Sequence, residues 1–178
     1  MNIRDILTLY DYNAWANRQI LAACARVSQE QFLDATTHSA GSLRDTLVHT
    51  LDSERAWRML CQHSTLDGFR DLEEAAFPSV AVLTERWQEE EQAMRNYLAQ
   101  LTDADLDGYV RYTTPEGDRR ERVLWHCLVH SINHGTQHRS EAAVMLTDYG
   151  CSPGGLDFTL FLNSYQAEPR TQNPEPRT

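Results

Sequence analysis

The sequence predicts an all-α fold, a four-helix bundle with crossover connections and one short additional helix at the C-terminus. In four long segments, apolar residues recur at steps of three and four, which is the spacing of one face of an α-helix. No segment shows the convincing alternation of apolar and polar residues that a half-buried strand would need. The connections over residues 26–41, 62–79 and 102–118 are long and polar rather than tight hairpins. Such connections are typical of bundles with crossovers.

The first two helical segments are defined by their apolar faces and by a start signal. The first covers residues 3–24, where apolar or small residues follow one helix face. Asn17 falls on the same face. We interpret it as a hydrogen-bonded amide in the core, and a residue that lines a site is the alternative. The second segment begins at the sequence SLRD (42–45), which resembles a capping box, and runs to about Cys61.

The remaining helices follow from the same periodicity. The third segment keeps helical spacing over residues 80–101. The fourth is the longest and is expected over residues 119–149, with Gly150 and Pro153 as typical signals of a helix end. A short fifth helix is expected near residues 156–165.

The segments around these helices carry weaker signals. The sequence TTPEGDRR (113–120) is expected to form a turn or a small hairpin. The basic run RRER (119–122) is interpreted as the exposed start of the fourth helix rather than as a binding patch. We predict one bundle domain over residues 1–165. The tail over residues 166–178 is Pro-rich, polar and poor in apolar residues, and is expected to be disordered.

Composition argues against several classes of function. The chain has 178 residues and a formal net charge of −10 at pH 7, so a nucleic-acid backbone would be repelled on average. The N-terminus lacks the features of a signal peptide, and no stretch approaches the length of a membrane span. None of the four cysteines belongs to a C-x-x-C pair, which favours reduced, mostly buried thiols. We expect a soluble, cytoplasmic protein with a small-molecule substrate, no nucleic-acid or membrane partner, and a homodimer as an open alternative.

Histidine is the residue type that points to chemistry. Seven histidines are present, and four of them are spaced four apart in the fourth segment: His126, His130, His134 and His138. Residues four apart on a helix are neighbours. Each consecutive pair could therefore direct two imidazoles at one metal ion, with a third ligand from elsewhere in the fold. Spacing alone leaves three such pairs open.

Position along the helix favours the last pair. His138 lies on the inward-facing stripe of the fourth segment, and His134 lies one step away, beside the small residue Gly135. His126 is nearer the exposed start of the segment. We therefore prefer His134 with His138, and His130 with His134 is the second choice.

His49 on the second helix is available as a third ligand. Ser53 and Ala56 share its side of the helix and are small enough to open a pocket, and Asp45 lies one turn earlier, where it could orient the imidazole. Three neutral imidazoles would leave open positions on the ion, as in catalytic metal sites. Spacing alone keeps an alternative open, in which these histidines are solvated or hydrogen-bonded and hold no metal.

At these residues the sequence resembles the DinB/YfiT-like family of helical metalloenzymes, which is unrelated to the DNA polymerase of the same name. The resemblance covers about residues 1–165. It is carried by the segments YDYNAWANRQIL (10–21), LRDTLVHTLDSERAW (43–57), LVHSINHGTQHRSEAAVMLTDYG (128–150) and CSPGGLDFTLFL (151–162). The NHGTQHR segment, following a histidine on the second helix, is the most specific part.

The resemblance implies a bundle of up-down-down-up topology and one metal ion held by His49, His134 and His138. His130 matches a position that is often histidine in relatives but is not carried over as a ligand. Ser140 stands where many relatives have glycine, which concerns local packing and not the ligands. Some relatives are S-transferases or isomerases that use a low-molecular-weight thiol. In them, an open metal position would lower the pKa of the thiol and favour the nucleophilic thiolate.

The leading hypothesis is a divalent-metal-binding protein that acts as a thiol-dependent S-transferase or a related detoxification or stress enzyme. Metal-dependent hydrolysis is the second hypothesis, with metal-bound hydroxide as nucleophile and a general base among Asp45, Asp52 and Glu141. A non-enzymatic, stress-associated metal-binding protein is the third. Imidazole suits zinc, nickel, iron and copper alike, and manganese is a further candidate, so the residues do not select the metal.

Overall fold

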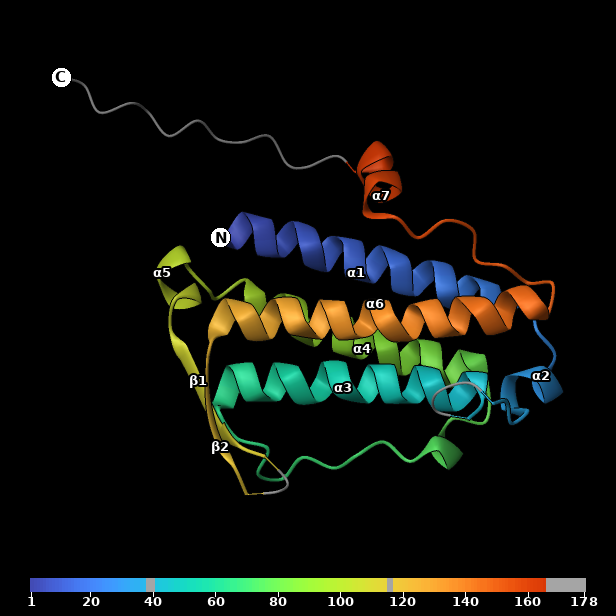
Figure 1. Ribbon diagram of the computed structural model, residues 1–178, viewed down its shortest axis with the longest axis horizontal. Coiled ribbons are helices and arrows are strands. Elements are labelled where there is room, and N and C mark those ends of the chain that lie inside the picture. Colours follow the sequence, from blue (N-terminus) through green and yellow to red (C-terminus); the bar gives the residue numbers. More distant parts are fainter. Residues whose placement is uncertain (38–40, 115–116, 166–178) are drawn as a thin grey trace.

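Four long helices dominate the computed structural model, which describes residues 1–37, 41–114 and 117–165 (Figure 1). They are α1 (Ile3–Cys24), α3 (Leu43–His63), α4 (Val80–Leu98) and α6 (Leu124–Asp148). Each long helix packs against two others, in the order α1, α6, α3, α4 and back to α1. Helices α1 and α6 run in one direction and α3 and α4 in the opposite one (Figure 1). The predicted all-α class is confirmed, apart from one small hairpin.

The starts of the long helices follow local sequence signals. The Oγ of Ser42 accepts a hydrogen bond from the backbone N–H of Asp45 at 3.0 Å, and the Asp45 carboxylate accepts one from the backbone N–H of Ser42 at 3.3 Å. This is the capping box expected from SLRD. Asn2 and Asp5 form an equivalent box at the start of α1. Ser79 accepts from Val82 at the start of α4.

The fourth long helix begins later than predicted, at Leu124 rather than at residue 119. Residues Arg119–Val123 form strand β2, which pairs antiparallel with β1 (Tyr109–Thr113). The sequence YVRYT is rich in the aromatic and β-branched residues that favour strands. Arg111 lies opposite Glu121 in the two strands, and its Nε is 2.5 Å from Oε2 of Glu121. The basic run is therefore a strand and not a helix start. The two strands form the hairpin expected within 113–120, of which residues 115 and 116 lie outside the described part of the chain.

Short elements occupy the long connections. They are α2 (Gln29–Leu33), the 3₁₀ turn η1 (Glu74–Ala76), α5 (Asp103–Leu106) and the expected fifth helix, here α7 (Phe158–Ser164). Helix α7 packs on α1 through rings, with Phe161 5.9 Å from both Tyr12 and Trp15 between ring centroids. The predicted disordered tail, residues 166–178, lies outside the described residues.

The core is divided by a polar layer. One apolar cluster joins Ile20, Leu47 and Met145 at the α2 end of the molecule, and a second joins Ile6 and Leu128 at the hairpin end. Between these clusters lie buried polar side chains from the long helices: Asn13, Asn17, Glu54, Glu90, Ser131, His138 and Arg139. These buried polar side chains therefore lie in the middle of the molecule.

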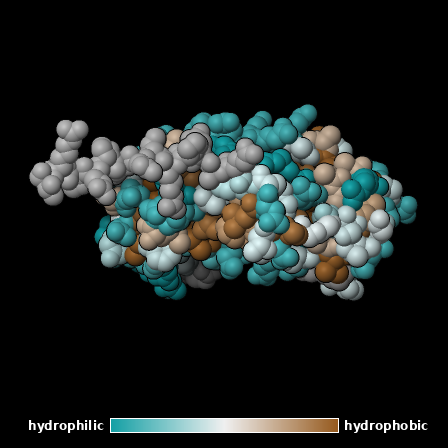
Figure 2. Space-filling model, turned by 90° about the horizontal axis from the view of Figure 1, so that it is seen from above, coloured by the Kyte–Doolittle hydropathy of each residue, from teal (hydrophilic) through white to brown (hydrophobic). Residues whose placement is uncertain are grey.

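The visible surface is of mixed hydropathy, and the cysteines are free thiols. Figure 2 shows one face on which hydrophobic residues lie among hydrophilic ones. Within the described residues, no helix is both long and apolar enough to cross a membrane. All four cysteines are free thiols, of which Cys24 and Cys127 are buried and Cys61 and Cys151 are partly exposed.

Candidate metal centre

Three histidines from two neighbouring helices converge on one point. His49 lies in the second turn of α3, and His134 and His138 lie one turn apart on α6. Each offers a ring nitrogen, and these three nitrogens lie within 4.8 Å of one another. The Nε2 atoms of His134 and His138 are 3.3 Å apart. Two nitrogens bound to one tetrahedral ion at about 2.0–2.1 Å would be about 3.3–3.4 Å apart, so this pair already has the spacing that a metal needs.

The Glu141 carboxylate sets the tautomer of His138. Its Oε2 lies 2.8 Å from Nδ1 of His138, three residues earlier on the same helix. Because an ionised carboxylate only accepts, Nδ1 carries the proton and Nε2 keeps its lone pair toward His49 and His134. Metal-binding histidines are commonly oriented by a carboxylate in this way.

Asp45, expected to orient His49, does not do so. Its two carboxylate oxygens bond to the backbone N–H of Ser42 and to Nε of Arg44. The first turn of a helix leaves N–H groups without intrahelical partners, and Asp45 satisfies one of them. The carboxylate that orients a histidine of the cluster is Glu141, which was expected only as a candidate general base. Its position three residues after His138 was the available signal, because residues at that spacing are neighbours on a helix.

The electrostatics of the cluster favour neutral imidazoles. Partial burial and the proximity of His138 and His49 together lower the pKa of His134 to about 4, because burial disfavours the charged ring and a second positive charge would be repelled. Burial and His138 also lower the pKa of His49, against the opposite effect of Asp52. At pH 7 both rings are therefore neutral. Neutral imidazole is the form that binds a metal ion.

The cluster is buried on one side and open on the other. His138 is 6% exposed, whereas His49 is exposed and His134 is intermediate. An ion held by these residues would keep solvent-facing positions, which is the arrangement of catalytic rather than structural metal sites.

The other candidate histidines lie outside this group. The His130 ring packs edge-on against Trp57, with centroids 4.6 Å apart, and its centroid is 6.0 Å from that of His134. His126 packs against Trp125. Of the three pairs left open by spacing, the structure brings 134/138 together with His49. Their role as metal ligands stays a prediction.

The polar layer holds α6 in the rotation that points its histidines at α3. Arg139, beside His138, is 2% exposed, and its Nη1 donates to Oδ1 of Asn13 at 2.6 Å and to Oδ1 of Asn17 at 2.9 Å. Both asparagines donate in turn to Oε1 of Glu54, at 2.8 and 3.2 Å. Asn17 is thus the hydrogen-bonded core amide that was expected.

Glu54 completes this layer on α3. Its Oε2 accepts a hydrogen bond from Nε1 of Trp87 at 2.9 Å. Burial raises the pKa of Glu54, while the hydrogen bonds from Asn13, Asn17 and Trp87 and the charge of Arg139 act in the opposite direction. No sequence pattern indicates this network, because its members lie far apart in the chain and on four different helices.

Gly135 makes the close packing of this layer feasible. A Cβ at this position would lie 2.8 Å from Nη1 of Arg139, 3.3 Å from Oδ1 of Asn13 and 3.5 Å from Oε1 of Glu54. The space expected beside His134 is therefore filled by the polar layer rather than by an open pocket.

Comparison with known proteins places the chain in a family. The model of the DinB family matches residues 1–173. The chain belongs to the DinB family. It is also 26% identical over 161 residues to Protein DinB from Bacillus subtilis strain 168, an alignment that covers 86% of this chain and 91% of that protein. The family resemblance noted from the sequence motifs is confirmed.

Proposed function

We propose that this DinB-family protein is a metal-dependent enzyme that transfers a low-molecular-weight thiol onto an electrophilic small molecule. The observation that carries the proposal is the convergence of His49, His134 and His138 at a site that is open on one side. Imidazole is a neutral ligand when it binds a metal, so a divalent ion held by three such rings would keep its positive charge for chemistry.

The three histidines would hold the metal ion, and Glu141 would orient one of them. When bound, the ion would supply a positive charge that lowers the pKa of a thiol at its open position. Glu141 holds the His138 ring so that Nε2 faces the site. The thiol proton would leave to solvent, and the thiolate sulfur would form a bond to an electrophilic carbon while the leaving group departs with its electron pair.

The surroundings favour thiol transfer over hydrolysis. A metal-assisted hydrolase needs a general base, and the three candidates are already engaged. Asp45 caps α3, and Glu141 is hydrogen-bonded to His138. Asp52 accepts hydrogen bonds from Arg55 at 2.6 Å and from the backbone N–H of Leu72 at 3.1 Å. A thiol is far more acidic than water before it binds a metal, so it ionises more readily without such a base.

Removal of any of the three histidines is expected to abolish stoichiometric metal binding. His49→Ala, His134→Ala and His138→Ala should each lose the ion, whereas Glu141→Gln should weaken its binding by about 10–100-fold. His126→Ala and His130→Ala are the matched controls and should bind like the wild type. Metal content after dialysis, measured by mass spectrometry, checks this. Loss of metal in His130→Ala with retention in His134→Ala would show that the ligand set is wrong.

Activity tests the transfer itself. Wild-type protein loaded with zinc, nickel, iron or manganese is mixed with glutathione, cysteine or coenzyme A and a fluorogenic alkyl halide. Conjugation should depend on the metal, should disappear in the three ligand variants and should persist in His126→Ala. A protein that binds one metal ion yet accelerates no conjugation with any of these thiols would contradict thiol transfer while leaving the metal centre in place.

Metal removal is expected to leave the helices formed. The three ligands come from α3 and α6, which already pack against each other, and the two apolar clusters do not include them. Loss of the ion should then cost only the binding free energy that it contributes to the native state. Circular dichroism during a chelator titration should show near-native helicity and a lower melting temperature. Collapse of the helical signal at room temperature would instead assign the ion a structural role.

A further inference from the structure

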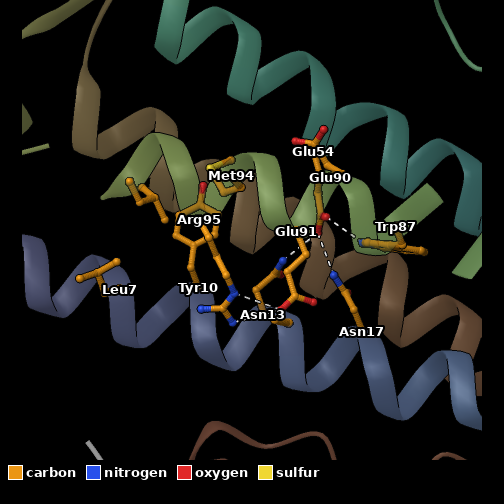
Figure 3. A pocket seen from close by; sticks show the side chains of 12 residues that line it. Leu7, Tyr10, Asn13, Asn17, Glu54, Trp87, Glu90, Glu91, Met94 and Arg95 are labelled. Carbon is orange, nitrogen blue, oxygen red and sulfur yellow. Dashed lines mark hydrogen bonds and ion pairs between the residues drawn. The ribbon is translucent and has the colours of Figure 1, made fainter. Parts of the chain in front are cut away.

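A cavity separate from the histidine cluster lies between α1 and α4 (Figure 3). Its volume is about 160 Å³, and none of His49, His134 and His138 lines it. An apolar cavity of about 150 Å³ holds one molecule of benzene, so this space suits a compound with a single ring. The polar layer stands between the cavity and the histidine-bearing face of α6.

The cavity walls are mostly apolar. Tyr10, Ala14, Trp87 and Met94 line it, and all four are buried. The exposed or half-exposed lining residues mark the mouth. There Arg95 on α4 bonds to Asp11 on α1 at 2.8 Å and to Glu91 at 3.1 Å.

The inner end of the cavity carries the Glu54 carboxylate, with the amides of Asn13 and Asn17 beside it (Figure 3). The amide N–H groups of Asn13 and Asn17 and the indole N–H of Trp87 all donate to Glu54. The carboxylate offers about four acceptor positions and receives these three bonds. These donors are thus already engaged. The Glu54 carboxylate can still accept a hydrogen bond from a ligand.

The charges that line the cavity also favour a ligand that donates hydrogen bonds. Three carboxylates line it, those of Glu54, Glu90 and Glu91. Glu90 is paired with Arg58 and Glu91 with Arg18, whereas Glu54 receives its hydrogen bonds from neutral side chains. The lining cation, Arg95, is already paired with Asp11 and Glu91 at the mouth. A bound anion would be repelled by the Glu54 carboxylate and would find no uncommitted cation among the described lining residues. A bound ammonium group would be attracted and could donate to Glu54.

We propose that this cavity binds a small primary amine with a single apolar ring, its ring against Tyr10 and Met94 and its ammonium group toward Glu54. The apolar walls favour the ring, and the buried carboxylate favours the charged donor. This site is independent of the proposed thiol chemistry, because it shares no residue with the histidine cluster.

Benzylamine is the probe, with benzyl alcohol and benzoate as controls of the same ring and near-equal size. Titrations followed by calorimetry and by NMR shifts should show saturable binding of benzylamine. Benzyl alcohol should bind about tenfold or more weakly, because its neutral hydroxyl makes a weaker hydrogen bond to a carboxylate than an ammonium group does. Benzoate should bind at least as weakly as benzyl alcohol, because Glu54 repels its charge. The His49→Ala variant should bind benzylamine like the wild type, which excludes coordination of the amine to a metal ion.

Two variants locate the site. Ala14→Leu fills the cavity and should weaken benzylamine binding about tenfold or more, while Ala22→Leu makes the same change at an exposed position of α1 and should have no effect. Glu54→Gln should remove the preference for benzylamine over benzyl alcohol. Failure of all three probes to bind, equal binding of benzoate, or benzylamine binding that Ala14→Leu leaves unchanged would each overturn the proposal.

Discussion

Replacing Arg139 by Met is expected to lower the free energy of unfolding by about 3–5 kcal/mol, because it leaves buried polar partners without a cation. Arg139 is 2% exposed and donates to the oxygens of both Asn13 and Asn17. The variant would leave these oxygens unpaired and the buried Glu54 carboxylate uncompensated. Urea denaturation followed by circular dichroism measures the change. Arg18→Met, at a side chain that is 57% exposed, is the control and should change stability by less than about 0.5 kcal/mol.

A double variant tests whether charge compensation is the cause. Combining Arg139→Met with Glu54→Gln removes the buried cation and the buried anion together. The combined loss of stability should be smaller than the sum of the two single losses by about 0.5–3 kcal/mol, since the two groups act in one network. Strictly additive losses, or an Arg139→Met variant as stable as the wild type, would contradict the assignment of this layer. Metal content should also fall in Arg139→Met, because α6 is then free to rotate its histidines away from His49.

Replacing Gly135 by Val is expected to destabilise the protein by about 3 kcal/mol through overpacking. Even the first atom of a side chain would lie 2.8 Å from Nη1 of Arg139 and 3.3 Å from Oδ1 of Asn13. Arg139 cannot move aside without breaking its bonds to the two asparagines. Thermal and urea unfolding measure the effect, and Ser140→Val, at an exposed position of the same helix, is the matched control.

For the smaller change Gly135→Ala, helix propensity and packing predict stability changes of opposite sign. Helix propensity alone predicts that alanine stabilises a helix interior by about 1 kcal/mol relative to glycine. The contacts of the polar layer predict a net loss of stability instead. A Gly135→Ala protein that is more stable than the wild type would show that the layer relaxes around the new methyl group.

Local sequence determined the helices and two of the three histidines of the candidate site. The capping box at Ser42 and Asp45 is formed by residues three apart, and the apolar spacing of each long helix is a property of neighbouring turns. The pairing of His134 with His138 was predictable for the same reason, because one helical turn brings both rings to one face. Such features depend on backbone geometry that any helix shares.

Tertiary structure decided what spacing left open. His49 stands 85 positions before His134 in the chain, and only the packing of α3 on α6 brings it to the pair. The strand at Arg119–Val123 exists because β1 is there to accept its hydrogen bonds, although its basic sequence reads equally well as an exposed helix start. Asn13 and Arg139 are 126 positions apart, and neither carries a local sign of the other. The physical reason is that hydrogen bonding and charge compensation in a core depend on which helix faces meet, and a helix's own periodicity specifies its buried face but not the partner that covers it.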